Sequence, residues 1–186
     1  KWYGNNDTVV NWENDGYEIK NFKDENGKVR SRPQNTQYYF NPSISWSDIS
    51  SSSNSFKIYP KGFIFDVCGM SCFEVPNRIN LLGVLNTKFY AFLSHILNPT
   101  MHFQIGNFKQ LPYLEIPLED FDHLVRKNIS ISKQDWDAHE TSWDFQRNEL
   151  VNLSDDIRIE EEGDPAATVI TSSPISLLIQ EYHAIW

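Results

Sequence analysis

The apolar positions at the start of the chain predict short strands joined by loops. Residues 1–40 hold only brief apolar pieces, at 8–10 and 17–19. The pair Asn26-Gly27 lies between the apolar residues Phe22 and Val29, and such a pair favours a tight hairpin turn. We therefore predict short strands over residues 1–40 and a hairpin that turns at Asn26-Gly27.

Strand-like runs alternate with turn residues between positions 38 and 75. The turn residues are Asn, Pro, Gly and Ser, at 41–42, 50–54 and 60–62. The runs between them are rich in aromatic and β-branched residues, and they occupy 38–40, 44–46, 56–59 and 63–68. This alternation predicts a small, mainly antiparallel sheet.

Helical spacing first appears over residues 80–97, after a start signal at Pro76-Asn77. Asn98-Pro99 is expected to end this helix. Two further strands, 103–105 and 113–116, are predicted around a Gly106-Asn107 turn, and Pro117 closes the compact part. The fold class predicted for the chain is thus α+β, with small antiparallel sheets and a few helices.

The remaining residues predict an extension. Phe121, Leu124 and Val125 indicate a short amphipathic helix, and an aromatic and acidic stretch follows at 132–145. Residues 160–165 are typical of a solvated linker, and 170–186 of the start of another helix. We therefore divide the chain into a domain of residues 1–117 and an acidic C-terminal extension of residues 118–186.

The composition is that of a globular protein, but its charge is uneven. The 186 residues are 40% hydrophobic and 14% aromatic, with a formal charge of −9. Residues 1–114 carry 11 Lys and Arg against 9 Asp and Glu, whereas residues 115–186 carry 5 against 16. Such asymmetry is typical of a part that faces nucleic acid beside an acidic tail, so the acidic average does not exclude a DNA partner.

Compartment and chain ends are expectations from the same sequence. It contains no apolar run approaching the roughly 18 residues of a membrane span, and it begins at Lys1 without a leader pattern. We expect a cytoplasmic fragment of a longer protein, with no membrane partner. Cys68 and Cys72 lie too far apart in an extended segment for a disulfide, so we expect reduced core thiols.

Motifs for catalysis are incomplete. The nucleophile elbow, the phosphate-binding loop, the dinucleotide fingerprint and the zinc-protease pattern are absent from the sequence. Glu140 and Asp144 would share a helix face, and together with Asp135 and Asp137 they are either a solvated surface or an acid/base or metal pair. The segment at 98–101 keeps two letters of the Asn-Pro-Pro-aromatic loop of amino-methyltransferases, and we interpret it as a helix stop.

A dense basic cluster lies at residues 20–32. Its cations are opposed by Asp24 and Glu25, so the cluster is either a set of phosphate contacts or a soluble loop. The same alternatives hold for the Ser/Asn loop at 50–54, which Lys57 and Lys61 follow. Trp2, Trp12 and Trp46 fit a core better than base-stacking platforms.

Ordered blocks of the sequence resemble a known family. They lie at 1–6, 10–16, 31–36, 43–47, 60–67, 85–88, 98–100, 103–106, 111–112 and 132–145. Together they resemble the PglX family, the adenine-specific DNA methyltransferases of BREX-type phage-defence systems. Blocks of this length and order are more specific than a short motif.

The resemblance implies a part of an enzyme. In this family the S-adenosylmethionine fold and its Asn-Pro-Pro-Tyr loop precede a target recognition domain, and this chain resembles the second region. Asn86-Thr87-Lys88 matches the helix signature of recognition domains in restriction-modification enzymes. We therefore expect no catalytic residue, metal or cofactor in the fragment itself, while S-adenosylmethionine is implied for the parent enzyme.

The implied partners are double-stranded DNA and the parent's own N-terminal methyltransferase domain, with other defence-system subunits as further candidates. The alternative function is a protein-interaction module that docks such subunits without touching DNA. We also expect the hairpin at residues 20–32 and the Ser/Asn loop to face DNA and the acidic tail to face away. The implied DNA-binding residues are Lys20, Lys23, Lys28, Arg30, Arg32, Lys57, Lys61 and Lys88.

Overall fold

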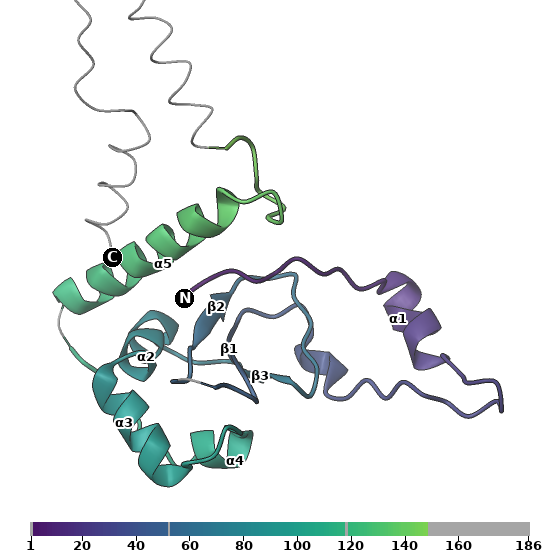
Figure 1. Cartoon of the computed structure of the whole chain (residues 1–186), viewed down its shortest axis with the longest axis horizontal. Coiled ribbons are helices and arrows are strands. Elements are labelled where there is room, and N and C mark those ends of the chain that lie inside the picture. Colours follow the sequence, from purple (N-terminus) through teal and green to yellow (C-terminus); the bar gives the residue numbers. More distant parts are fainter. Residues whose placement is uncertain (1, 52, 118, 149–186) are drawn as a thin grey trace, which may run out of the picture. The chain divides into compact units, whose positions relative to one another are not determined.

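The computed structural model describes residues 2–51, 53–117 and 119–148 (Figure 1). The chain forms two compact units, Lys1–Gln134 and Asp135–Trp186. The described residues combine helices with a small antiparallel sheet, so the predicted α+β class is confirmed. The boundary predicted at residue 117 stays a prediction. None of the described helices is long and apolar enough to cross a membrane.

The sheet of the first unit has three strands in the order β2-β1-β3, all antiparallel. The central strand β1 is Ser43–Ser47, and it pairs with β2 (Lys57–Tyr59) and β3 (Gly69–Cys72). Ile44 of β1 lies opposite Ile58 and Cys72. The antiparallel sheet and its first two paired strands were therefore predicted from the apolar runs.

Two of the predicted strands are wrong. Residues Thr36–Tyr38 form a 3-10 helix instead of a strand over 38–40. The strand predicted over 63–68 begins later, at Gly69, because the Asp66 carboxylate accepts the backbone N–H groups of Cys68 and Gly69 at 2.9 and 2.8 Å. These bonds form a turn at the position where the apolar run suggested extended chain.

The helix predicted over 80–97 is two helices, α2 (Arg78–Leu85) and α3 (Lys88–Leu97). The Asn77 side chain caps α2, and the Thr87 side chain caps α3. Between them, the Asn86 side chain accepts the backbone N–H of Phe56 at 3.1 Å and donates to its carbonyl at 2.9 Å. The break between the helices therefore places Asn86 where it completes the backbone hydrogen bonding of the buried Phe56. Asn98 ends α3, as predicted.

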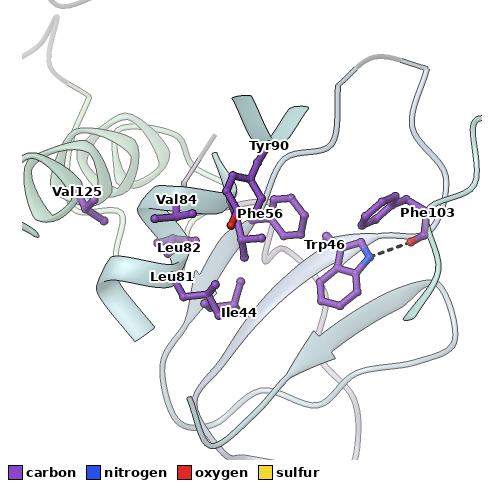
Figure 2. Close-up of a cluster of buried hydrophobic side chains, with 10 residues drawn as sticks. Ile44, Trp46, Phe56, Leu81, Leu82, Val84, Tyr90, Phe103 and Val125 are labelled. Carbon is purple, nitrogen blue, oxygen red and sulfur yellow. Dashed lines mark hydrogen bonds between the residues drawn. The ribbon is translucent and has the colours of Figure 1, made fainter. Parts of the chain in front are cut away.

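The core lies between the sheet and these helices (Figure 2). Trp46 is 3% exposed and donates its indole N–H to the Phe103 carbonyl at 2.8 Å. It is therefore a core residue, as predicted. The other buried apolar residues are Ile44, Phe56, Leu81, Leu82, Val84, Leu85, Tyr90, Phe103 and Val125.

The helix α5 (Glu119–Asp137) covers α2 with its first part. At Gly83 an added Cβ would lie 2.3 Å from a methyl group of Val125 and 2.8 Å from the Phe121 ring, so the two helices are in close contact there. Trp2 donates its backbone N–H to the Ser132 hydroxyl at 3.2 Å. The amphipathic helix predicted after residue 118 is thus present and longer than expected.

The strands predicted over 17–19, 103–105 and 113–116 are also wrong. Residues 13–20 form α1 (Glu13–Lys20), in which Asn14, Asp15 and Gly16 have left-handed backbone angles, a conformation open to Asn, Asp and Gly. Ile105–Phe108 form the short helix α4, stabilised by reciprocal bonds between Gln104 and Asn107, and the described residues 113–116 contain no strand. The predicted linker and final helix, 160–165 and 170–186, lie outside the described residues.

Candidate nucleic-acid interface

Residues 20–32 form a hairpin, which we call the basic hairpin. Asp24 donates its backbone N–H to the Lys28 carbonyl at 2.9 Å, and Arg30 donates its own to Phe22 at 2.9 Å. Lys23 and Val29 pair as an isolated antiparallel bridge. Gly27 takes the positive φ of 77° that the turn requires, so the turn predicted at Asn26-Gly27 is confirmed.

Asp24 organises the hairpin. One carboxylate oxygen accepts the backbone N–H groups of Asn26 and Lys28 at 3.0 and 2.9 Å, while the other lies 3.0 Å from Nε of Arg30. The side chain is 19% exposed, in contrast to the 60% of its partner Arg30. Asp24, which opposes the cations in the sequence, therefore stabilises the turn on which these cations are exposed.

The five cations of the hairpin fall into two groups. Lys20 is paired with Asp15 at 2.6 Å and lies 5.4 Å from the centre of the Trp12 ring, and Arg30 is paired with Asp24. The hydrogen bond and charge of Lys20 lower the pKa of Asp15. Lys23, Lys28 and Arg32 are exposed and have no ion pair within the part of the chain that the structure describes. These three offer the most available positive charge.

The other predicted contacts are spread over different elements. Lys57 lies on the edge strand β2 and donates its ammonium to the Gly4 carbonyl at 3.3 Å, while Lys61 is exposed in the turn that follows. Lys88 is the exposed first residue of α3, which lies across the sheet from α1 (Figure 1). The fold therefore gathers the hairpin cations into one segment and sets Lys88 apart from them. The role of all eight cations in DNA binding stays a prediction.

A cleft of about 720 Å³ adjoins the basic hairpin, and sequence reasoning missed it. Ser31, Arg32 and Pro33, which leave the hairpin, form part of its rim. Five aromatic residues line it, and we call it the aromatic cleft: Trp12, Tyr38, Tyr39, Phe65 and Phe73. Trp12 is half-buried here rather than part of the core cluster. The rings come from segments far apart in the chain, so no local sequence pattern predicted that they would line one cleft.

The acidic stretch of the second unit does not form the predicted helix face. α5 ends at Asp137, and Glu140 and Asp144 lie in turns beyond it. The Ser142 hydroxyl donates to the Asp137 carboxylate at 2.7 Å, and His139 contacts the Asp135 carbonyl at 2.6 Å through Nδ1. Within the described residues, no three His, Cys, Asp or Glu side chains gather as a metal site.

The two cysteines differ from the expected pair of core thiols. Cys72 on β3 is half-buried, and burial raises the pKa of its thiol. Cys68 is exposed in the turn before β3, so its description as a core residue was wrong. Neither forms a disulfide. Cys68 lies in the Asp66 turn, which replaces the strand predicted over 63–68.

Two known proteins are similar to this chain in sequence. The chain is 34% identical over 156 residues to the adenine-specific methyltransferase BrxX of Escherichia coli O9:H4 (strain HS). It is 37% identical over 154 residues to the adenine-specific methyltransferase PglX of Lacticaseibacillus casei (strain Zhang). Each match covers 81% of this chain. The resemblance to the PglX family is confirmed.

The matched region is a small part of these relatives. The chain spans 12% of the length of BrxX and 13% of that of PglX. No protein-family model matches the chain. The similarity to these methyltransferases is thus confined to one segment of their length.

Proposed function

We propose that this chain is the DNA target-recognition part of a site-specific adenine-N6 DNA methyltransferase of a phage-defence or restriction-modification system. The basic hairpin is the observation that carries the proposal. It presents Lys23, Lys28 and Arg32 without carboxylate partners among the described residues, on a turn held by Asp24. The names of the relatives, both adenine-specific methyltransferases, supply the reaction.

In this proposal the hairpin positions the parent enzyme on DNA. Lys and Arg side chains contact phosphates and fix the register of a protein on the duplex, and an Arg can also take the two acceptors of a guanine edge. Lys20 and Arg30 can join them by exchanging their carboxylate partners for phosphates, since each of these ion pairs has one exposed member. Lys57, Lys61 and Lys88 are secondary contacts.

The chemistry belongs to the rest of the parent enzyme. Its N-terminal domain, in the cytoplasm, binds S-adenosylmethionine, takes an adenine out of the base stack and transfers the methyl group. The chain described above supplies the selection of the DNA sequence and has no catalytic role. Double-stranded DNA and the N-terminal methyltransferase domain are its partners.

Charge reversal tests the proposal in the full-length enzyme. Lys28→Glu, Arg30→Glu and Arg32→Glu together should reduce methylation at the target site by at least about tenfold, because several phosphate contacts become repulsive. The matched control reverses Lys109, Arg126 and Lys127, which are also exposed but lie outside the hairpin. Unchanged methylation in the hairpin variant, or an equal loss in the control, contradicts the proposal.

A second candidate function is a module that docks other defence-system subunits. One observation favours it: α3 exposes Phe89, Phe92 and Ile96 to 55%, 62% and 60% along one side. Exposed apolar residues grouped in this way are typical of protein contacts. Phe92→Ser and Ile96→Ser would abolish co-purification of a subunit under this function and leave DNA affinity unchanged, whereas the hairpin variant would do the reverse.

A further inference from the structure

We propose that the aromatic cleft binds one unstacked nucleobase of the DNA that the basic hairpin holds. The inference rests on the proposed function, since it requires DNA at the hairpin, and it adds a binding site with a defined ligand class. Three observations carry it: the rings that line the cleft, the polar groups at its rim, and its continuity with the hairpin.

The rings form a connected wall. Tyr38 stacks on Phe73 with centroids 5.2 Å apart and planes at 19°. The ring centroid of Phe65 lies 5.1 Å from that of Phe73 and 5.0 Å from that of Tyr39. The centroids of Tyr39 and Trp12 are 4.9 Å apart. Aromatic surfaces of this kind hold nucleobases by stacking whatever their sequence, because every base has a π-face.

Polar groups at the rim match the edges of a base. Arg32 is exposed and can donate to ring nitrogens and carbonyl oxygens, and Asp66 can accept from an exocyclic amine. Both hydrogen bonds to Asp66 from Cys68 and Gly69 use the same oxygen, Oδ1. The Tyr39 hydroxyl is protonated and able to donate at neutral pH like any tyrosine, and burial together with the charge of Asp66 raises its pKa further.

The cleft continues from the hairpin. Arg30 makes the last backbone bond of the hairpin, and the next residues, Ser31 to Pro33, already form the rim. Lys20 covers the Trp12 ring, which lines the same cleft, at 5.4 Å from its centre. A phosphate bound by Lys20 or Arg32 would therefore lie next to the aromatic cleft, where the base of the same nucleotide can reach the rings.

A second cleft, which no basic residue lines, serves as a comparison for the aromatic cleft. It measures about 420 Å³ and is lined by Leu81, Leu85, Phe108 and Tyr113 among others, with Glu74 at its rim and no Lys or Arg in its lining. Charge at that rim is unfavourable for a phosphate. The aromatic cleft differs from it in its larger volume and in Arg32 at its rim.

The test compares two DNA probes bound by the full chain. One is a short duplex, and the other is the same duplex with one extra, unpaired nucleotide whose base is 2-aminopurine. Because a base without a pairing partner costs less free energy to take out of the stack, binding in the cleft should favour the second probe by about fivefold or more. The 2-aminopurine fluorescence should also change, because the base exchanges stacking on its neighbours for stacking on the rings.

Two cleft variants and a matched control make the test specific. Phe65→Leu and Tyr38→Leu keep apolar volume but remove a ring face, so each should abolish the preference and the fluorescence change. Phe92→Leu removes a ring that is 62% exposed on α3, away from the cleft, and should change neither. If circular dichroism shows that Phe65→Leu unfolds, the Tyr38→Leu variant, at a half-buried position, decides the test alone.

The outcomes separate this inference from the proposed function. Salt-dependent binding of both probes with equal affinity, or a preference that both Leu variants retain, overturns the nucleobase site and leaves the hairpin as a DNA contact. Binding of neither probe overturns the proposed function as well. Recovery of the preference in Tyr38→Phe, which restores the ring without the hydroxyl, would support stacking as its cause.

Discussion

The basic hairpin and the sheet core of the first unit are built on opposite principles. In the core, Ile44 and Leu82 are fully buried, and polar bonds such as that of Trp46 serve the packing. In the hairpin, the apolar residues Phe22 and Val29 are 60% and 49% exposed, and the shape depends on backbone bonds and on Asp24. Stability and charge display are thus assigned to different regions, and substitutions should separate them.

The largest expected effect is on stability and lies in the core. Leu82→Ala removes a fully buried side chain and should lower the free energy of unfolding by about 2–5 kcal/mol, through reduced burial and a residual cavity. Denaturant unfolding measures it. Leu97→Ala, at a position 36% exposed on α3, is the matched control and should cost about 1 kcal/mol or less. An equal loss at both positions contradicts the assignment of stability to the core.

The next effect breaks the link between α2 and the sheet. Asn86→Leu removes the amide that satisfies both backbone groups of Phe56, and it should cost about 1–3 kcal/mol because these groups stay buried without partners. DNA affinity should stay unchanged in the folded fraction. A destabilisation below about 0.5 kcal/mol would show that water replaces the amide and that the bonds contribute little.

A smaller effect is expected in the hairpin, on DNA affinity rather than on stability. Asp24→Asn keeps an oxygen that can accept from the Lys28 backbone N–H but removes the negative charge beside Arg30. DNA affinity should rise on the order of a few-fold, because Arg30 is released for phosphate contact. Asp24→Ala removes the acceptor too and serves as the comparison. Weaker binding by Asp24→Asn than by the unchanged chain would contradict this account of the turn.

The smallest effect concerns the two thiols, which report on the Asp66 turn. Cys68 is exposed, whereas Cys72 is half-buried and has a raised pKa, so iodoacetamide should modify Cys68 first at neutral pH. The difference between the modification rates of the two thiols should narrow as the pH rises through the raised pKa of Cys72, because the reactive thiolate of Cys72 then forms. Mass spectrometry of the modified peptides gives both rates, and faster modification of Cys72 is the contrary result.

Local signals in the sequence predicted the features that depend on neighbours in the chain. The Asn26-Gly27 turn, the Asn77 helix start and the strand at 44–46 are of this kind. The break at Asn86 was not predicted because its cause, the backbone of Phe56, lies 30 residues away. The apolar residues on both sides of Asn86 have continuous helical spacing, so the pattern indicated one helix.

The candidate site was predictable to the same extent. The cations of residues 20–32 form a cluster in the sequence and remain together in the fold. The sequence did not distinguish paired from unpaired cations, because the partners of Lys20 and Arg30 depend on the left-handed turn at Asp15 and on the hairpin geometry. The sequence did not predict the aromatic cleft, because only the tertiary structure brings Trp12, Tyr39 and Phe73 together.

The salt dependence of DNA affinity tests the central claim most directly. A plot of log affinity against log salt concentration should fall steeply for the full chain. Replacing Lys23, Lys28 and Arg32 by Gln should make the slope shallower by about 0.9 for each phosphate that the variant no longer neutralises. The exposed positions of these residues predict little change in stability. A flat plot, or a slope that the triple variant leaves unchanged, would show that the basic hairpin does not hold DNA.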